Sequence, residues 1–263
     1  MFGKQTPKSC PVLLSSRLAC RKWKALASGK AMASHPTTTP HKSWLGSYDY
    51  PTSHRLLEVG ALAAFAVFSS LFARRVVAEV VGRLSWATSF AVLGSLLLGY
   101  ALADFLSGLV HFLFDNFGSP ETPLVGQKFI KPFRDHHDDP KAMTLGDAVA
   151  VNADNCLACL PVLIPVFFLL DLARHPYIGL FLVALLFFTM LTNQLHKWAH
   201  MAQRPRVVTV LQRMHLVLSV DHHQVHHTAP FDTHYCITWG MLNPLLERLG
   251  FWGFLLRVLR RPA

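Results

Sequence analysis

A long apolar run that ends in histidines, 177-YIGLFLVALLFFTMLTNQLHKWAH-200, decides the architecture of this chain. Residues Tyr177 to Leu195 carry no charge, and about 20 such residues in a helix cross the hydrocarbon core of a bilayer. His196 and His200 then follow at positions i and i+4, so both imidazoles lie on one helical face. The stretch predicts a transmembrane helix with a pair of metal ligands at its end.

Three further apolar runs precede this one, at Leu56 to Phe72, Leu84 to about Leu113, and Cys156 to Leu170. The first is at the short limit for a spanning helix. The third contains Pro161 and Pro165, which predict a kink or a partly re-entrant segment. The sequence therefore predicts an all-α integral membrane protein with about four transmembrane helices, both termini on one side, and a histidine-rich cap that holds two metal ions.

The composition agrees with a membrane protein, because 52% of the residues are hydrophobic and only 15% are charged, against roughly 25% charged in soluble domains. Residues 1 to 48 contain no Asp or Glu and are rich in Lys, Arg, Ser, Thr and Pro. That composition is typical of an organellar transit peptide or a basic disordered tail, and we favour the tail because 31-AMASHPTTTPHKS-43 has little amphipathic character. Residues 49 to 263 then form one membrane-embedded domain.

The net charge of +10 has no nucleic-acid-binding motif beside it, so we expect no nucleic acid partner. Lys and Arg gather on the cytosolic side of membrane proteins. In the four-span arrangement the opposite side keeps mainly Arg74, Arg75, Arg83 and Arg174. The predicted orientation therefore places the histidines in the cytosol, on a basic surface that meets anionic lipid headgroups.

The five cysteines are odd in number and scattered, so they predict no disulfide framework. Cys156 and Cys159 have the spacing of a redox or zinc pair. They open an apolar run without a second pair, however, and we interpret them as small packing residues.

Fifteen histidines are the strongest signal in the sequence. In 221-DHHQVHH-227, residues 222/226 and 223/227 are i, i+4 pairs, and His111 with Asp115 repeats this relation at the end of the second span. Imidazoles with a few carboxylates suit iron or zinc, and the absence of clustered thiolates argues against structural zinc. One zinc ion takes three or four protein ligands, so the larger inventory predicts two ions. The predicted ligands are His111, His136, His137, His196, His200, His215, His222, His223, His226 and His227, with Asp115, Asp221 and Asn193 orienting them.

The chain resembles the Kua or CarF-type membrane lipid desaturases across about residues 90 to 253. The resemblance is carried by 108-GLVHFLFDNFGS-119, 123-PLVGQKFIKPFRDHHDDP-140, 152-NADNCL-157, 193-NQLHKWAH-200, 222-HHQVHH-227 and 235-YCITWGMLN-243. The family's histidine boxes fall on His196 to His200 and His223 to His227. Wider membrane desaturases have H-x3-H as a first box, whereas this chain has Asp115 four residues after His111, so Asp115 is either a ligand or a partner that fixes an imidazole.

The resemblance implies removal of two hydrogens from C1 and C2 of the sn-1 O-alkyl chain of plasmanylethanolamine, which makes the vinyl-ether bond of a plasmalogen. It implies two non-haem irons, O2, and electrons from NAD(P)H through cytochrome b5 and its reductase, because no side chain supplies an oxidant for an unactivated C–H bond. It also implies a multi-pass protein of the endoplasmic reticulum, with an organellar membrane as the alternative. The basic residues Lys128, Lys131 and Arg134 are the predicted contacts for the lipid headgroup.

Three other functions stay open at this point. An acyl-lipid desaturase, such as the enzyme type that puts a trans double bond into palmitate on phosphatidylglycerol, has the same chemistry on another chain. A lipid hydroxylase has the same metal centre but leaves an alcohol. A zinc transporter needs ionisable ligands near the middle of the membrane, whereas the histidines here lie at helix ends and in loops.

Overall fold

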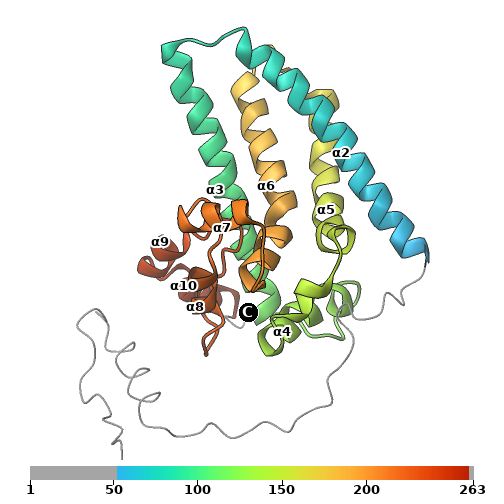
Figure 1. Cartoon of the computed structure of the whole chain (residues 1–263), viewed down its shortest axis with the longest axis vertical. Coiled ribbons are helices and arrows are strands. Elements are labelled where there is room, and N and C mark those ends of the chain that lie inside the picture. Colours follow the sequence, from blue (N-terminus) through green and yellow to red (C-terminus); the bar gives the residue numbers. More distant parts are fainter. Residues whose placement is uncertain (1–51, 261–263) are drawn as a thin grey trace, which may run out of the picture. The chain divides into compact units, whose positions relative to one another are not determined.

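Four long helices dominate the computed structural model, which describes residues 52 to 260. They are α2 (Thr52–Val81), α3 (Trp86–Asn116), α5 (Ala148–Leu169) and α6 (Pro176–His200), and each is long and apolar enough to cross a membrane (Figure 1). Residues 52 to 260 contain no strand. The prediction of an all-α protein with four spans is confirmed, while the predicted basic tail at residues 1 to 48 lies outside the described residues.

The first span is longer than its apolar run predicts, because α2 continues from residue 72 to Val81. Arg75 Nη1 donates to the carbonyl of Phe167 at 2.6 Å, and Arg83 donates to the carbonyl of Ala173 at 2.8 Å. These cations therefore bind the C-terminal end of α5 and the turn that follows it. A helix can keep charged residues at its end when they have such acceptors, and the sequence pattern alone does not reveal them.

Of the two alternatives predicted for the third span, a kink or a partly re-entrant segment, the re-entrant one is wrong, since α5 is a single helix from Ala148 to Leu169 that contains both Pro161 and Pro165. Cys156, Cys159 and Leu163 of this helix are buried against α2 and α6. This packing holds the helix together across the prolines, as neighbouring helices do in membranes. The interpretation of Cys156 and Cys159 as packing residues is confirmed.

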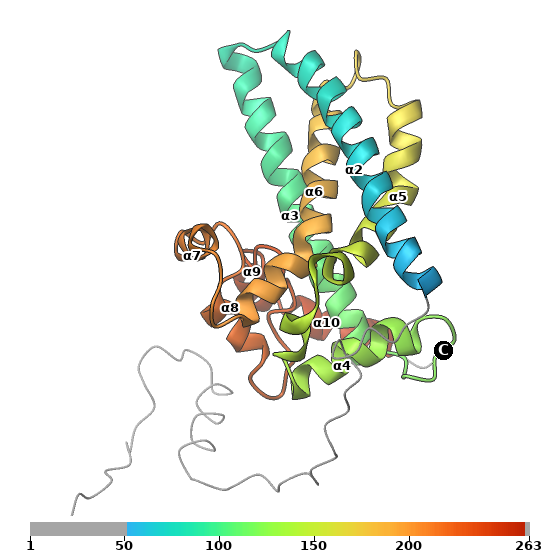
Figure 2. The same ribbon diagram turned by 45° about the vertical axis from the view of Figure 1, so that its right-hand side comes forward.

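Helix α6 packs against α3, α5 and α2 (Figure 2). Gly99 of α3 brings the two backbones into close contact, because a Cβ at this position would lie 2.5 Å from the carbonyl oxygen of Phe181. Small residues permit such close approach between membrane helices. The contact fixes the lower end of α6, which carries His196 and His200, beside the lower end of α3, which carries His111.

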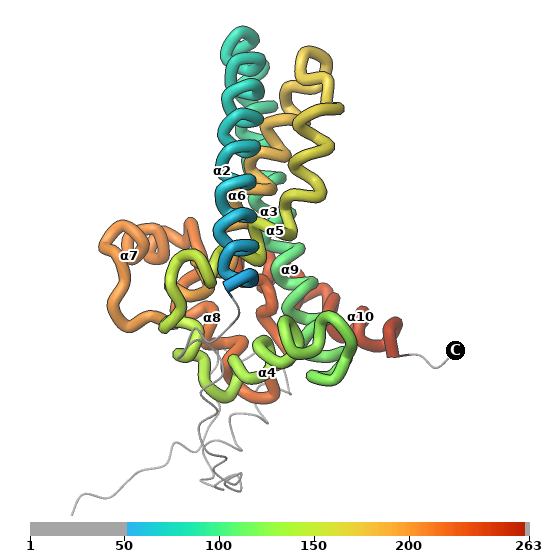
Figure 3. Tube along the Cα trace, turned by 90° about the vertical axis from the view of Figure 1, so that its right-hand side faces the viewer, coloured from blue at the N-terminus to red at the C-terminus, as the bar shows by residue number. Residues whose placement is uncertain are grey.

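Shorter helices gather at the end of the bundle where α3 and α6 end and α2 and α5 begin (Figure 3). A buried apolar cluster of Phe112, Tyr235, Leu246 and Trp252 joins the end of α3 to the C-terminal segment. The short elements are a π-helical turn at Gly126–Ile130, α4 (Lys131–Asp138), a 3-10 turn at Ala142–Leu145, α7 (Arg206–Arg213), α8 (Val220–His226), α9 (Asn243–Arg248) and α10 (Phe251–Leu259).

Candidate metal centre

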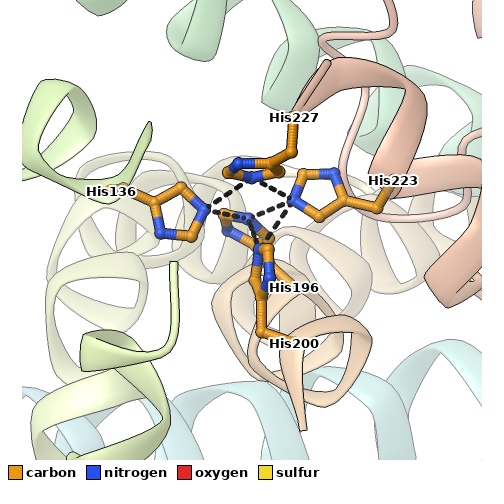
Figure 4. Close-up of side chains that lie close together, drawn as sticks. All are labelled: His136, His196, His200, His223 and His227. Carbon is orange, nitrogen blue, oxygen red and sulfur yellow. Dashed lines mark hydrogen bonds between the residues drawn. The ribbon is translucent and has the colours of Figure 1, made fainter. Parts of the chain in front are cut away.

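Five imidazoles from three elements converge beneath the bundle and form what we call the five-histidine site. His196 and His200 come from the last turns of α6, His136 from α4 and His223 from α8, and His227 directly follows α8. Figure 4 shows the five rings turned toward one another. Their ligand atoms all lie within 4.8 Å of one another, in residues His136, His196, His200, His223 and His227.

The Nε2 atoms of four of these histidines form a closed ring. Its successive edges, from His136 to His196, His223, His227 and back, measure 3.0, 2.8, 3.1 and 3.1 Å. His200 Nε2 lies 3.2 Å from that of His196 and 2.8 Å from that of His223. A neutral imidazole has one N–H to donate, so hydrogen bonds alone cannot satisfy three such contacts at His196. A shared cation resolves this crowding of lone pairs.

The number of converging imidazoles bears on the kind of ion that they can hold. Five ligands exceed the four of a structural zinc site. The residues therefore fit an ion with more than four ligands.

A second group adjoins the first, and we call it the Asp115 site. It consists of His111, Asp115, His137 and His226. Asp115 Oδ2 lies 3.1 Å from His137 Nε2, 3.4 Å from His111 Nε2 and 3.6 Å from His226 Nε2. The Nε2 atoms of His111 and His226 are buried and have no hydrogen-bond partner within the described residues. Three nitrogens around one carboxylate oxygen form a suitable donor set for a second ion.

Backbone carbonyls fix the orientation of two of these rings. His111 Nδ1 donates to the carbonyl of Tyr235 at 3.2 Å, and His226 Nδ1 donates to that of Thr233 at 2.7 Å. A proton on Nδ1 leaves the Nε2 lone pair free to face Asp115. Such carbonyl partners are the usual outer support of metal-binding histidines.

Burial keeps the cap histidines neutral. Burial, together with the neighbouring imidazoles, lowers the pKa of His226 to about 3 and that of His227 to about 2. Burial also lowers the pKa of His136 and His223 well below the ordinary value. Neutral imidazole is the form that binds metal. The site is thus prepared for metal at neutral pH.

The adjacent histidines of the sequence divide between the two sites. His136 belongs to the five-histidine site and His137 to the Asp115 site, while His227 belongs to the first and His226 to the second. Neighbouring residues on a helix point about 100° apart, so one short helix can supply a ligand to each of two adjoining ions. Each of these two adjacent His-His pairs therefore supplies one ligand to each of the two sites, as a two-ion centre requires.

Several predicted site residues lie outside both groups. His222 Nε2 contacts Asn243 Nδ2 at 3.1 Å, and the backbone carbonyl of His215 accepts from the Trp239 indole at 2.7 Å. Asn193 Nδ2 donates to Asn155 at 3.3 Å, and Asp221 is exposed. The structure thus does not bring His215, His222, Asp221 or Asn193 to the convergence of ligand atoms.

The three basic residues predicted to meet the headgroup have protein partners. Lys128 Nζ lies 2.9 Å from Asp154 Oδ1, and Lys131 pairs with Asp135. Arg134 donates to the carbonyl of Gly118 at 2.8 Å. Lys128 thus pairs with α5 and Lys131 pairs within α4, while Arg134 holds the segment that follows α3.

Asp104 is a supporting residue that the sequence analysis does not single out. Its side chain is fully buried in α3, and Oδ1 accepts from the backbone N–H groups of Thr238, Trp239 and Gly240 at 3.2, 2.7 and 2.8 Å. The segment held in this way also contains the carbonyls that orient His111 and His226. The sequence does contain a signal for this role, namely a carboxylate within an apolar span. Such a residue costs free energy in a membrane and therefore points to a specific function.

The comparisons with known proteins agree with this geometry. The chain is 40% identical to the plasmanylethanolamine desaturase of Myxococcus xanthus, over 78% of this chain and 74% of that protein. It is 42% identical to plasmanylethanolamine desaturase 1 of Mus musculus, over 64% of each chain. It is 36% identical to the chloroplastic fatty acid desaturase 4 of Arabidopsis thaliana, over 57% of this chain and 46% of that protein. No solved structure matches the chain.

A family model described as the lipid desaturase domain matches residues 100–261. The matched range contains every member of the five-histidine site and of the Asp115 site. This protein, whose four apolar helices carry two adjoining histidine sites at one end, therefore belongs to the lipid desaturase family.

Proposed function

We propose that this desaturase forms the vinyl-ether double bond of a plasmalogen, by removing two hydrogens from C1 and C2 of the sn-1 O-alkyl chain of plasmanylethanolamine. The observation that carries the proposal is that two adjoining groups of metal ligands lie where the membrane-spanning helices α3 and α6 end. The names and the identities of 40% and 42% of the bacterial and mouse relatives support this substrate.

Iron is the metal that we propose for both sites. Five converging imidazoles exceed the four ligands of tetrahedral zinc, and imidazole with carboxylate suits iron. Bound iron, with O2 and two electrons, supplies an oxidant strong enough for an unactivated C–H bond. Balance requires that two hydrogens leave the lipid while two electrons and two protons arrive, so that O2 ends as two waters.

The residues of this chain hold and shield the centre. His111 and His226 are fully buried, and His223 is 1% exposed. This burial keeps bulk water from these ligands, and a centre shielded from water suppresses side reactions of the oxidant. The Asp115 carboxylate lies among three imidazoles and lowers the net charge of the site.

We further propose that electrons arrive from NAD(P)H through cytochrome b5 and its reductase, at a cytosolic face of the endoplasmic reticulum. All nine ligands of the two groups lie at one end of the four spans, so a donor reaches them from one compartment. The basic residues of the sequence favour the cytosol for that end.

An acyl-lipid desaturase is the second candidate, favoured by the likeness to the chloroplastic fatty acid desaturase 4. A lipid hydroxylase is the third. All three reactions use one centre, so the product must be identified chemically.

Cells that lack plasmalogens, complemented with this chain, test the proposal. We expect vinyl-ether ethanolamine lipids to return, as measured by acid-labile aldehyde release and mass spectrometry. His200→Ala should abolish the product, whereas His175→Ala should not, because His175 caps the opposite end of α6. A trans acyl double bond or a hydroxylated lipid in place of the vinyl ether overturns the substrate.

A further inference from the structure

An open cavity of about 930 Å³ lies beside the five-histidine site, between the end of α6, α7 and the start of α8. His200, a proposed metal ligand, is part of its wall. Cavities of several hundred Å³ hold small organic ligands. This one therefore has room for a polar group within reach of the metal centre.

The wall carries both signs of charge. Lys141, Arg204 and Arg213 supply cations, and Asp221 supplies a carboxylate. Within residues 52 to 260, the side chains of Lys141, Arg213 and Asp221 form no hydrogen bond or ion pair, in contrast to Lys128, Lys131 and Arg134. The cavity therefore offers charges that no group of residues 52 to 260 neutralises.

Two buried polar atoms of the wall also have no partner among the described residues. Arg204 donates through Nη1 to the carbonyl of Met201 at 2.8 Å, but its Nε has no acceptor. Gln212 donates through Nε2 to Leu218 at 2.9 Å, but its Oε1 has no donor. An unpaired buried polar group costs about 1–3 kcal/mol. The wall beside the cavity is thus not fully satisfied by the described residues.

Helix α7 places the cavity at the depth of lipid headgroups. Its residues Val207 and Val210, and Met214 after it, are 64%, 51% and 60% exposed. Figure 3 shows α7 beside the bundle, near the level where the spans end. A helix with an exposed apolar face and a polar face lies in the membrane interface. The polar face here includes Gln212 and Arg213, which line the cavity.

The structure of the substrate demands an anion site close to the metals. C1 of an sn-1 alkyl chain is separated from the phosphorus at sn-3 by roughly six covalent bonds of about 1.5 Å, so they cannot lie more than about 9 Å apart. The phosphate must therefore bind within this distance of the reacting carbon. A cavity with His200 in its wall meets that demand.

We propose that this cavity binds the phosphoethanolamine headgroup of the lipid substrate. Arg204, Arg213 and Lys141 bind the phosphate, and Asp221 binds the ammonium. Guanidinium groups bind phosphate through paired charge-assisted hydrogen bonds. The identity of the ligand rests on the proposed function, but the site itself is testable without catalysis.

The experiment uses the purified metal-loaded chain in detergent and three probes. One is a short-chain 1-O-alkyl-glycerophosphoethanolamine, the second is the same alkylglycerol phosphate without ethanolamine, and the third is inorganic phosphate. Calorimetry gives Kd for each probe with wild type, Arg213→Gln, Asp221→Asn and Arg206→Gln. Arg206 is the matched control, because it is an exposed arginine of α7 outside the cavity wall.

Arg213→Gln should raise Kd for both lipid probes about 10-fold, the usual effect of losing one charge-assisted hydrogen bond. Asp221→Asn should weaken only the probe that carries ethanolamine, and Arg206→Gln should change neither. Equal Kd values for Arg213→Gln and wild type overturn the site. If inorganic phosphate competes at the same concentration as the lipid, the cavity is a site for a free anion. That result overturns the proposal that it binds the lipid headgroup.

Turnover separates this proposal from the proposed reaction. If wild type forms no vinyl ether but the binding pattern holds, the headgroup site stands and the reaction is wrong. If vinyl ether forms and Arg213→Gln has the KM of Arg206→Gln, the reaction stands and the headgroup site is wrong.

Discussion

The carboxylate of Asp104 accepts a hydrogen bond from the backbone N–H of Gly240 at 2.8 Å, which ties the middle of a membrane span to the segment that closes the metal centre. Gly240 has φ +81, and a Cβ there would lie 2.8 Å from the ring of His222. Glycine is required where the backbone is left-handed and crowded. The pair therefore positions the Tyr235 and Thr233 carbonyls, and through them His111 and His226.

Asp104→Ala should destabilise the protein strongly, because it leaves several buried backbone N–H groups without an acceptor. The loss should be about 3 kcal/mol or more. Asp104→Asn keeps an oxygen for those donors and should cost less. Thermal unfolding in detergent measures both, with Glu79→Ala as a control, since Glu79 forms only an exposed pair with Arg83. Equal stability of Asp104→Ala and Glu79→Ala would contradict the proposed support.

The purified chain should contain two iron ions. His200→Ala should release mainly the ion of the five-histidine site, and His226→Ala mainly that of the Asp115 site, because each residue belongs to one group. Metal analysis by mass spectrometry should find about one ion in each variant. A wild-type enzyme that is fully active with zinc alone would rule out the iron chemistry.

Asp115→Ala should nearly abolish activity, because Asp115 Oδ2 lies within 3.6 Å of three imidazole nitrogens. A residue that only supports a ligand typically costs 10–100-fold. Turnover and iron content decide between these roles. Asp138→Ala is the matched control, since Asp138 is exposed in α4 next to His137. A loss within 10–100-fold, with both irons kept, would make Asp115 a supporting residue.

Two adjacent histidines should behave differently when replaced by alanine. His223→Ala should lose an ion, because His223 Nε2 contacts three other Nε2 atoms. His222→Ala should keep both ions, because His222 contacts Asn243 instead. Iron content of the two variants, measured side by side, checks this assignment. Loss of iron from His222→Ala, in protein that remains folded, would return His222 to the ligand set.

Topology gives the last prediction. Glycosylation tags beside His137 and after Pro230 should stay unmodified in a eukaryotic host, because the histidine end is proposed to face the cytosol. A tag in the turn between Asp171 and Pro176 should be modified, since this turn lies at the other end of α5 and α6. A mobility shift after glycosidase treatment reports both. Modification beside His137 would reverse the orientation.

The sequence by itself determined the spans and three ligand pairs. Apolar runs specify membrane helices because lipid forces the backbone to satisfy its own hydrogen bonds. The i, i+4 relation makes neighbours of 196/200, 111/115 and 223/227, and each pair lies in one ligand group. These features are local consequences of helical geometry.

Only the tertiary structure decided how the histidines divide between two sites. His222 and His226 are also an i, i+4 pair, yet His226 reaches Asp115 at the end of α3 while His222 meets Asn243, because the first and last turns of α8 contact different segments of the chain. Likewise, Lys128 and Arg213 are both basic residues that the sequence does not pair with any partner. In the structure, Lys128 pairs with Asp154, whereas Arg213 lines a cavity. Spacing along a helix fixes direction relative to that helix, whereas the orientation of one helix against another depends on contacts between residues far apart in the chain.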